Sequence, residues 1–371
     1  MLDEVNITTH KEIYPLTQRD NFFLNAPLLA FLRGEGRFIP FGGGAFMQQT
    51  FLWRGLQTDA YAPGDDFTPI RRQILASATF RPKFYFALIV EYLEDIEVLN
   101  TGPNAIFSLI ETDLAAAMNS MTSRTAVMLQ LDGIGARANH INGWPEAIND
   151  GISPSYNAGI YTSYGNQLRS EIGAAYNSTP RFLGDATGAL GKMTYKELNR
   201  GYMDCHIGME QPNIGVGNKA IIAHIEELME AKQRLEQEAD PYFGVHTGIK
   251  FKNALIMKDD LFPSAVYGQN AEYGNFSTAG ATITAPAGLP ATFAAQTIAM
   301  GTTLQVGEVF CWFNTRTMHF RLSNSPLFMY GFTGFLPSQI NTRVVGRIHA
   351  AQNLQIDAPR LNKQYYGHNP N

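Results

Sequence analysis

The chain has 371 residues, of which 45% are apolar and only 16% are charged, and its formal net charge is −5. The charged fraction lies below the roughly 25% that is usual for soluble globular domains. This favours a protein that covers much of its surface with partner subunits; a large monomer with an uncharged polar exterior is the alternative. No run of five basic residues occurs, which argues against sequence-specific nucleic-acid binding. The length suggests about two domains.

Neither a secretory signal nor a membrane span is expected. The first twenty residues, MLDEVNITTHKEIYPLTQRD, contain no apolar core, and no stretch of the chain reaches 18 uninterrupted apolar residues. Cys205 and Cys311 are the only cysteines, which is too few for a disulfide framework or a four-cysteine zinc site. We expect both to be buried thiols.

The first 78 residues predict two segments that cannot stabilise themselves. Residues 1–38 carry isolated apolar residues without a sustained period, which predicts an extended arm that lies on something else. Residues 39–78 alternate large apolar and polar residues on either side of YAPGDD, which predicts a long hairpin with its tip near Pro63 and Gly64. The glycines at 42–44 are followed by no Gly-Lys-Ser/Thr and predict a hinge or bulge. A two-stranded hairpin is marginal alone, so we expect it to pack on a neighbour.

Residues 79–149 predict a strand followed by a long helix. The stretch 78–99 is apolar on both of its alternating faces, which is typical of a central, buried strand. Apolar residues spaced three or four apart then run from Ile106 to Met128 and predict a helix over residues 103–132. A helix of that length would measure roughly 45 Å, which suggests a structural strut.

The middle of the chain predicts a mixed subdomain. Residues 134–192 are predicted to be rich in loops, and INGWPEAIND is expected to form a short ordered segment within them. The capping box from Thr194 to Glu197 opens a helix to about Ile207. The stretch PNIGVG predicts a strand and residues 218–240 predict a helix, so the class is α+β or α/β here. The Ala/Thr/Gly-rich segment 275–304 predicts a β excursion or an exposed loop, and strands follow it to the C-terminus.

Asp259 and Asp260 are the strongest candidates for catalysis, because they end the apolar run ALIM of a predicted strand. Adjacent strand residues point to opposite faces, which does not build a paired acid and base. A turn or an interface ion pair is therefore the preferred interpretation, and metal binding or catalysis the alternative. Cys205 and His206 are also adjacent, but neighbours on a helix point about 100° apart and cannot readily pair.

Aromatic and charged residues around the hairpin are candidates for contacts between subunits. Interface energy concentrates in aromatic and arginine side chains; the alternative for the aromatic residues is a local minicore. An acidic cluster after the strand could be neutralised by the arginines that flank the hairpin of a neighbouring subunit. The candidate anchors are Phe46, Phe51, Trp53 and Tyr61, the acids Glu91, Glu94, Asp95 and Glu97, and the arginines Arg54, Arg71, Arg72 and Arg81.

The order of these elements resembles the major capsid proteins of tailed bacteriophages, which have the α+β Hong Kong 97 fold. Local matches are GISPSYNAGIYTSYGNQLRS, the helix–Pro-Asn–strand–helix passage from MTYKELNRGYMD to AIIAHIEEL, FKNALIMKDDLFPSAVYGQN, and RVVGRIHAAQNLQIDAPRL. The resemblance covers nearly the whole chain. It implies an N-terminal arm at 1–38, an E-loop at 39–78, a P-domain strand and spine helix at 79–149, an A-domain at 150–335 and a return to the P-domain at 336–371.

The resemblance implies a structural protein without enzymatic activity or cofactors. Its subunits would form hexamers and pentamers of an icosahedral shell around double-stranded DNA held without sequence specificity. A separate scaffolding protein and a portal would be partners, with decoration proteins as further candidates. The shell would assemble in the host cytoplasm and persist in the virion. Some family members cross-link an E-loop lysine, but residues 39–80 contain no lysine. A cellular encapsulin-type nanocompartment is the alternative, and an α+β hydrolase that uses Asp259 and Asp260 is a remote one.

Overall fold

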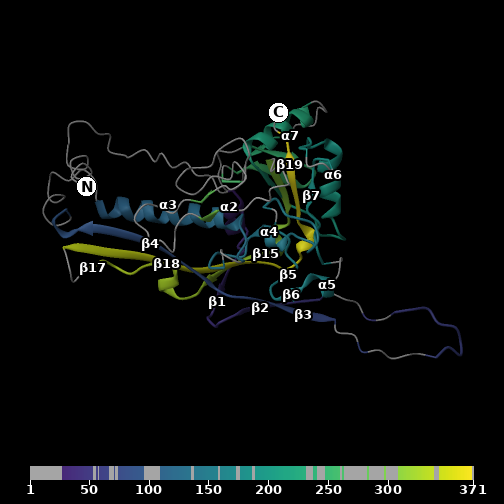
Figure 1. Ribbon diagram of the computed structural model, residues 1–371, viewed down its shortest axis with the longest axis horizontal. Helices are drawn as coiled ribbons and strands as arrows, with labels where there is room; N and C mark the ends of the chain where they lie inside the picture. The colour runs from purple at the N-terminus through teal and green to yellow at the C-terminus, as the bar shows by residue number, and fades with distance from the viewer. Residues whose placement is uncertain are drawn as a thin grey trace.

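The fold contains two large sheets joined side by side, with a long helix lying along one of them (Figure 1). A computed structural model describes residues 27–52, 56, 58–66, 71, 74–95, 109–134, 138–157, 159–172, 176–185, 189–230, 237–239, 247–259, 261–262, 282–283, 296–297, 308–337 and 342–369. Helices and strands mix along the chain, which confirms the α+β prediction.

The six-stranded sheet is built around one strand of 14 residues, β18 (Arg343–Ile356). It pairs on one side with β4 over ten residue pairs and on the other with β15, β16 and β17 in turn. β1 pairs in parallel with the outer edge of β15. The other members of this sheet are β1 (Phe38–Phe41), β4 (Lys83–Tyr92), β15 (Met318–Ser323), β16 (Met329–Phe332) and β17 (Leu336–Pro337).

The strand predicted to be central and buried, β4, is instead an edge strand, because β18 is its only partner among the described strands. One of its faces is covered by the long helix α3 (Leu109–Leu129), which packs on Tyr85, Ala87 and Ile348. The other face carries Phe84, Phe86 and Leu88 and is exposed. Apolar residues on both faces therefore do not mean burial on both faces within this subunit.

Helix α3 confirms the predicted strut but is shorter than expected. Its 21 residues make a length of about 32 Å. It ends at Leu129, three residues before the predicted end at Asp132, because residues 130–134 turn toward the next segment. The beginning of the predicted helix, residues 103–108, lies outside the described residues.

The prediction of an extended arm is wrong for its last part, because Pro27–Gly34 form the helix α2. Leu28, Leu29, Phe31 and Leu32 are buried in the main core, and the spacing of these four residues is that of an amphipathic helix. A run of only eight residues is too short for its period to be recognised in the sequence. Residues 1–26 lie outside the described part of the chain.

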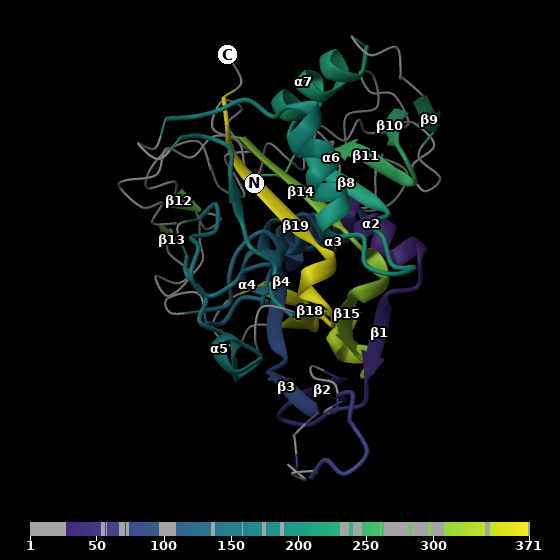
Figure 2. The ribbon, with the colours of Figure 1, turned by 90° about the vertical axis from the view of Figure 1, so that its right-hand side faces the viewer.

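The seven-stranded sheet has the order β7-β19-β14-β8-β11-β10-β9. Its strands are β7 (Arg181–Phe182), β8 (Ile214–Gly217), β9 (Gln237–Ala239), β10 (Thr247–Phe251), β11 (Ala254–Lys258), β14 (Glu308–Phe313) and β19 (Lys363–His368). Helices α6 (Tyr195–Asp204) and α7 (Lys219–Glu230) cover one face (Figure 2). The opposite face closes the main core, so that Phe310 and Trp312 of β14 face the helices while Val309, Cys311 and Phe313 face the core.

Both helices predicted in this region are present at the expected places. The second was predicted to be longer than it is. Thr194 caps α6 by accepting a hydrogen bond from the backbone N–H of Glu197 at 3.2 Å, as expected of the capping box. α7 begins at Lys219, but the prediction of a helix up to 240 is wrong, because Gln237–Ala239 form β9 and pair with β10. A short polar strand at a sheet edge has no periodic signal against the helical pattern before it.

The chain changes sheets at places other than the expected boundary at 335/336. It passes from the seven-stranded to the six-stranded sheet between β14 and β15, through the 3₁₀ turn η5 (Thr315–Thr317). It returns after β18 through η7 (Pro359–Leu361), so the last strand, β19, belongs to the seven-stranded sheet. Strand partners are chosen over long sequence separations, which local patterns do not encode.

The remaining described elements are small. The hairpin of β2 (Met47–Leu52) and β3 (Leu75–Phe80) confirms the predicted excursion, and its turn lies at Pro63 and Gly64. The others are β5 (Ser163–Tyr164), β6 (Gln167–Leu168), β12 (Thr282–Ile283), β13 (Gln296–Thr297), α4 (Trp144–Ala147), α5 (Arg169–Ile172) and η6 (Pro326–Phe328). Gly43 and Gly44 have φ of 107° and 110°, which confirms that the glycine run is a backbone bend that only glycine adopts readily.

Candidate assembly surfaces

The base of the β2–β3 hairpin is fixed to the body of the subunit. Thr79 donates its N–H to Gly165 O at 2.9 Å, and Gln167 donates from Nε2 to Ser77 O at 2.8 Å. Phe80 packs edge-on against Tyr164 with ring centroids 5.1 Å apart. Gly165 lies so close to β3 that an added Cβ would stand 2.6 Å from Ala78 Cβ. The hairpin therefore leaves the body in a fixed direction.

The outer part of the hairpin extends away from both sheets (Figure 1). Its described residues 56 and 58–66 are all exposed, and they include Leu56 and the predicted anchor Tyr61, which is 68% exposed. The acids Asp59, Asp65 and Asp66 lie in the same stretch. Within this tip the Ala62 N–H donates to Asp65 Oδ2 at 2.6 Å.

The other predicted aromatic anchors divide between surface and core. Phe46 is half exposed, and the Arg81 guanidinium lies over its ring at 5.2 Å. The prediction that Phe51 anchors to a neighbouring subunit is wrong. Its side chain is 9% exposed and stacks on Tyr176 with ring centroids 4.5 Å apart, so it stabilises the subunit itself. This agrees with the alternative of a local core at the hairpin base. Trp53 lies outside the described residues.

The charged residues predicted to form contacts between subunits differ in exposure. Arg71 and Glu94 are exposed, whereas Asp95 is 8% exposed, so its expected role as a surface charge is wrong. Asp95 follows β4 at the point where the chain enters a helical turn. Arg54 and Arg72 lie outside the described residues.

A second candidate surface is the face of the six-stranded sheet opposite α3, which we call the open sheet face. β4 contributes Phe84, Phe86 and Leu88, of which Phe84 is 66% exposed. Their register partners on β18 are Ala351, His349 and Arg347, and strand partners share a face. Phe328 of η6 covers one end, with its ring 5.9 Å from that of Phe84. Contiguous exposed apolar side chains on a sheet mark an interaction surface.

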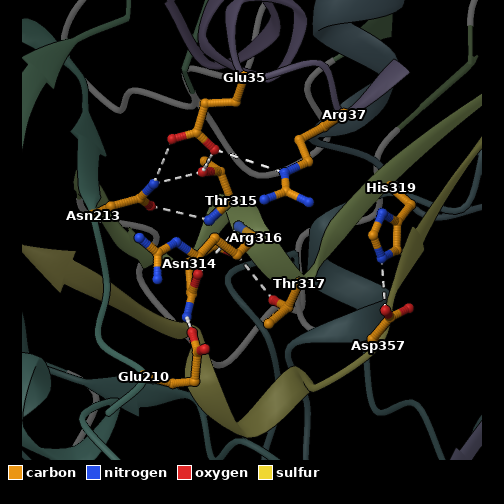
Figure 3. A network of polar contacts seen from close by, with 10 residues as sticks. All are labelled: Glu35, Arg37, Glu210, Asn213, Asn314, Thr315, Arg316, Thr317, His319 and Asp357. Carbon is orange, nitrogen blue, oxygen red and sulfur yellow. Dashed lines mark hydrogen bonds and ion pairs between the residues drawn. The ribbon is translucent and has the colours of Figure 1, made fainter. Parts of the chain in front are cut away.

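Between the two sheets lies a polar network built around the crossover η5 (Figure 3). Asn213 donates from Nδ2 to Glu35 at 3.0 Å and to Thr315 Oγ1 at 2.6 Å, and its Oδ1 accepts the N–H of Thr315 at 3.0 Å. Thr315 Oγ1 also donates to Glu35, and Arg37 lies 3.8 Å from the same carboxylate. The network thus joins the end of α2 to the point where the chain changes sheets.

The two crossovers between the sheets are bonded to each other. The N–H of Asn314 donates to Asn362 Oδ1 at 2.8 Å, and the N–H of Asp357 donates to Thr317 O at 2.9 Å. His319 Nε2 lies 2.6 Å from Asp357 Oδ2 on the neighbouring strand end. Polar networks of this kind favour one arrangement of the elements that they join.

This polar network was not predicted from the sequence. Its asparagines stand directly beside strand ends, Asn213 before β8, Asn314 after β14 and Asn362 before β19. Asparagine next to a predicted strand is the available signal, because its side chain bonds nearby backbone groups in turns. That signal indicates a turn and gives no information on which turns meet.

Asp259, the described member of the predicted carboxylate pair, forms a turn. Asp259 is buried, and its Oδ1 accepts the N–H of Leu261 at 2.8 Å, as expected of a turn-forming aspartate. Asp260 lies outside the described residues. Among the residues that the structure describes, no three His, Cys, Asp or Glu side chains are grouped to hold a metal ion.

Both cysteines are buried and unpaired by disulfides, as predicted. Burial raises the pKa of each thiol well above its ordinary value. Within the described part of the chain, no helix is both long and apolar enough to cross a membrane.

Comparison with known proteins shows similarity in structure only. No family model matches the sequence, and no curated protein matches it. The structure resembles the capsid subunit of cyanophage A-1(L), with a TM-score of 0.61 and 10% identity over 96% of this chain and 97% of that one. It also resembles the capsid of the native GTA particle, with a TM-score of 0.58, 10% identity and 96% coverage of both chains.

A third similar structure is the SrpI encapsulin complex of Synechococcus elongatus, with a TM-score of 0.56 and 8% identity over 100% of this chain and 96% of that one. The alignments span nearly the full length of both partners in every case, so the shared architecture is that of the whole chain. The chain therefore has the Hong Kong 97-type fold found in phage capsid and encapsulin subunits.

Proposed function

We propose that this chain is a major capsid protein, which self-assembles into the icosahedral shell of a tailed phage around packaged double-stranded DNA. The observation that carries the proposal is the pairing of a shell-protein fold with two surfaces whose described residues include exposed apolar side chains. These are the hairpin tip around Leu56 and Tyr61 and the open sheet face around Phe84 and Leu88. A shell needs such distributed surfaces more than it needs a pocket.

In this proposal the β2–β3 hairpin is the E-loop. The six-stranded sheet with α3 is the P-domain, and the seven-stranded sheet with α6 and α7 is the A-domain. The E-loop and P-domain surfaces bury apolar area against neighbouring subunits, at about 25 cal/mol per Å² removed from water. Closed symmetric rings, here hexamers and pentamers, are the expected arrangement.

Charge supports a contact between the hairpin tip of one copy and the open sheet face of another. The tip carries Asp59, Asp65 and Asp66, whereas the open sheet face carries the exposed arginines Arg343 and Arg347. Opposite charges at the rim of an apolar contact fix its register and speed association. The exposed Arg71 near the hairpin and Glu94 after β4 add a second charge pair that two copies could form.

The DNA would be held at high density without base-specific contact, consistent with the net charge of −5 and the absence of a basic run. A separate scaffolding protein, a portal and decoration proteins are further expected partners. Assembly would take place in the host cytoplasm. The proposal includes no catalytic role, and Asp259 is a turn-former in it.

A nanocompartment shell is the second candidate, because an encapsulin is among the similar structures. Such a shell would enclose cargo protein instead of DNA. Electron microscopy of the native particles, with extraction of their contents, separates the candidates: nuclease-sensitive DNA supports the phage capsid, and a defined cargo protein supports the nanocompartment. Monodisperse small particles of one or two chains would contradict both.

A further inference from the structure

Two exposed apolar tips flank the seven-stranded sheet, apart from the hairpin tip and the open sheet face. The first is a tight turn directly after α6, in which Ile207 and Glu210 exchange backbone hydrogen bonds of 3.0 and 3.1 Å. Gly208 has a φ of 65°, and Met209 at the tip is 94% exposed. Ile207 and Met203 beside it are exposed as well. We call this segment the Met209 turn.

The Met209 turn is fixed by bonds to neighbouring segments. Gln211 Oε1, directly after the turn, accepts the Tyr202 hydroxyl at 3.1 Å and Asn253 Nδ2 at 3.3 Å. Glu210 Oε2 accepts a bond from Asn314 Nδ2 at 3.1 Å. An apolar side chain that is presented in this way can bind a partner with little additional ordering cost.

The second tip is a loop that follows α4 and carries Ile152, which is 82% exposed. The N–H of Ile152 donates to Asp150 Oδ1 at 2.9 Å. Ile160, which is 54% exposed, lies in the adjacent stretch, where the N–H of Tyr161 donates to Asn149 Oδ1 at 3.4 Å. We call this segment the Ile152 loop. It is the counterpart of the Met209 turn, because it also presents exposed apolar side chains on a bonded backbone.

The two tips lie on opposite faces of the seven-stranded sheet. The Met209 turn follows α6 on the helix-covered face, where Tyr202 lies edge-on to Trp312 with ring centroids 5.6 Å apart. The Ile152 loop lies on the other face, since the Tyr366 hydroxyl, which belongs to the main core, donates to Pro154 O at 3.0 Å. Figure 2 shows α5, which adjoins the Ile152 loop, to the lower left of α6 and β8, which flank the Met209 turn in the chain. The two tips therefore do not meet within one subunit.

The charge beside the Met209 turn is positive. Arg200 on α6 and Lys252 at the turn between β10 and β11 are both exposed. The acids there are bonded within the subunit, because Asp204 pairs with Lys363 at 3.5 Å and Glu210 accepts the bond described above.

The charge beside the Ile152 loop is negative. The loop itself carries Asp150, and α5, which packs under Gly151, carries the exposed Glu171. The cation of α5, Arg169, is 2% exposed and donates to the backbone of α4. The two tips are thus complementary in charge as well as apolar, and opposite charges around an apolar contact fix its register.

We propose that the Met209 turn of one copy packs against the Ile152 loop of the next copy, so that repeated contacts of this kind close a ring of subunits. A contact between two different surfaces of the same chain forms a ring when its rotation closes, whereas a contact between identical surfaces stops at a dimer. The inference rests on the proposed shell function and names the surfaces through which its rings form. These surfaces are separate from the hairpin tip and the open sheet face.

Cysteine cross-linking of the assembled full-length chain tests the contact. Met209→Cys and Ile152→Cys are combined in one chain and treated with a short bis-maleimide, which accepts a range of sulfur separations. The native Cys205 and Cys311 are 1% and 0% exposed, so they do not compete for the reagent. Denaturing electrophoresis should show a ladder of linked chains that ends at the ring size, because each copy is linked to two neighbours. Each single variant should show no ladder beyond the dimer.

The matched control combines Ile152→Cys with Glu226→Cys, an exposed site on α7, and should give no ladder. Assembled double variant that yields only single chains and dimers would overturn this inference and leave the proposed shell function intact. A wild-type protein that sediments only as a single chain would overturn both.

Variants that change polarity and charge give an independent measurement. Met209→Asp should lower the yield of rings at least about tenfold, as for a central apolar contact. It should leave thermal melting of the unassembled chain unchanged, because the side chain is 94% exposed. Arg200→Glu with Lys252→Glu should slow ring formation at low salt, and adding Glu171→Lys should restore part of the rate. A ring yield in Met209→Asp equal to that of the wild type would overturn the proposal.

Discussion

Asn213 and Glu35 lie 178 residues apart in the chain and meet through a hydrogen bond of 3.0 Å from Asn213 Nδ2 to the Glu35 carboxylate (Figure 3). Glu35 directly follows α2, and Asn213 precedes the buried strand β8 of the seven-stranded sheet. The bond therefore connects the helix α2 to the crossover between the two sheets. This bond, the hairpin tip and the open sheet face lead to four testable predictions.

Removal of Asn213 should destabilise the subunit, because it leaves Glu35 and Thr315 without their shared partner. We expect Asn213→Ala to lower the free energy of unfolding by about 2 kcal/mol, the usual cost of unsatisfied buried polar groups. Chemical denaturation of the unassembled chain measures this, with the exposed Asn324→Ala as the matched control. In a double-mutant cycle with Glu35→Gln the two effects should be less than additive; full additivity would show that the pair is not coupled.

Polar substitution of the open sheet face should affect assembly and spare the subunit. Phe84→Gln with Leu88→Gln removes exposed apolar area, so the free energy of unfolding of the single chain should change by no more than about 0.5 kcal/mol. Particle yield, measured by sedimentation, should fall at least about tenfold, which corresponds to roughly 1.4 kcal/mol of lost contact energy. Met118→Gln on the exposed side of α3 is the control for apolar loss elsewhere. Normal particle yield in the double variant would show that this face is not an interface.

Phe51 and Tyr61 on the same hairpin should behave oppositely. Phe51→Ala should destabilise the isolated subunit by about 3–5 kcal/mol, as for a buried aromatic side chain that packs on Tyr176. Tyr61→Ala should leave that stability unchanged within about 0.5 kcal/mol and reduce particle formation. Trp53→Ala should follow the Tyr61 pattern if Trp53 anchors to a neighbour. Thermal melting and particle yield, measured on the same preparations, decide; a large stability loss in Tyr61→Ala would place that ring in a contact within the subunit.

Charge reversal near the hairpin should impair assembly. Arg71→Glu together with Arg72→Glu is expected to slow particle formation, most clearly at low salt, because exposed charges steer association and are screened by ions. Adding Glu94→Arg should restore part of the rate if Arg71 meets Glu94 of a neighbour. Light scattering during assembly at two salt concentrations measures this. Equal assembly rates in all three proteins would exclude the charge pair.

Features with a local, periodic or capping signal were predictable from the sequence. The helix α3 and the Thr194 cap of α6 have such signals, and so does the hairpin turn at Pro63 and Gly64. Features that depend on which distant segments meet were not. The edge position of β4 follows from the choice of β18 as its only described partner.

The residues of the candidate assembly surfaces were likewise predictable only in part. Exposed Tyr61 and buried Phe51 belong to one alternating pattern, and only the docking of the hairpin base on Tyr176 and Tyr164 separates them.

In the proposed function the chain builds a closed shell around DNA. Electron microscopy of the native assembly, combined with nuclease digestion of its released contents, tests it most directly. The account predicts icosahedral particles whose walls are made of this chain and whose contents are double-stranded DNA. Particles that contain a protein cargo and no DNA would assign the shell to a nanocompartment, and a chain that remains a small soluble oligomer under all assembly conditions would contradict the account.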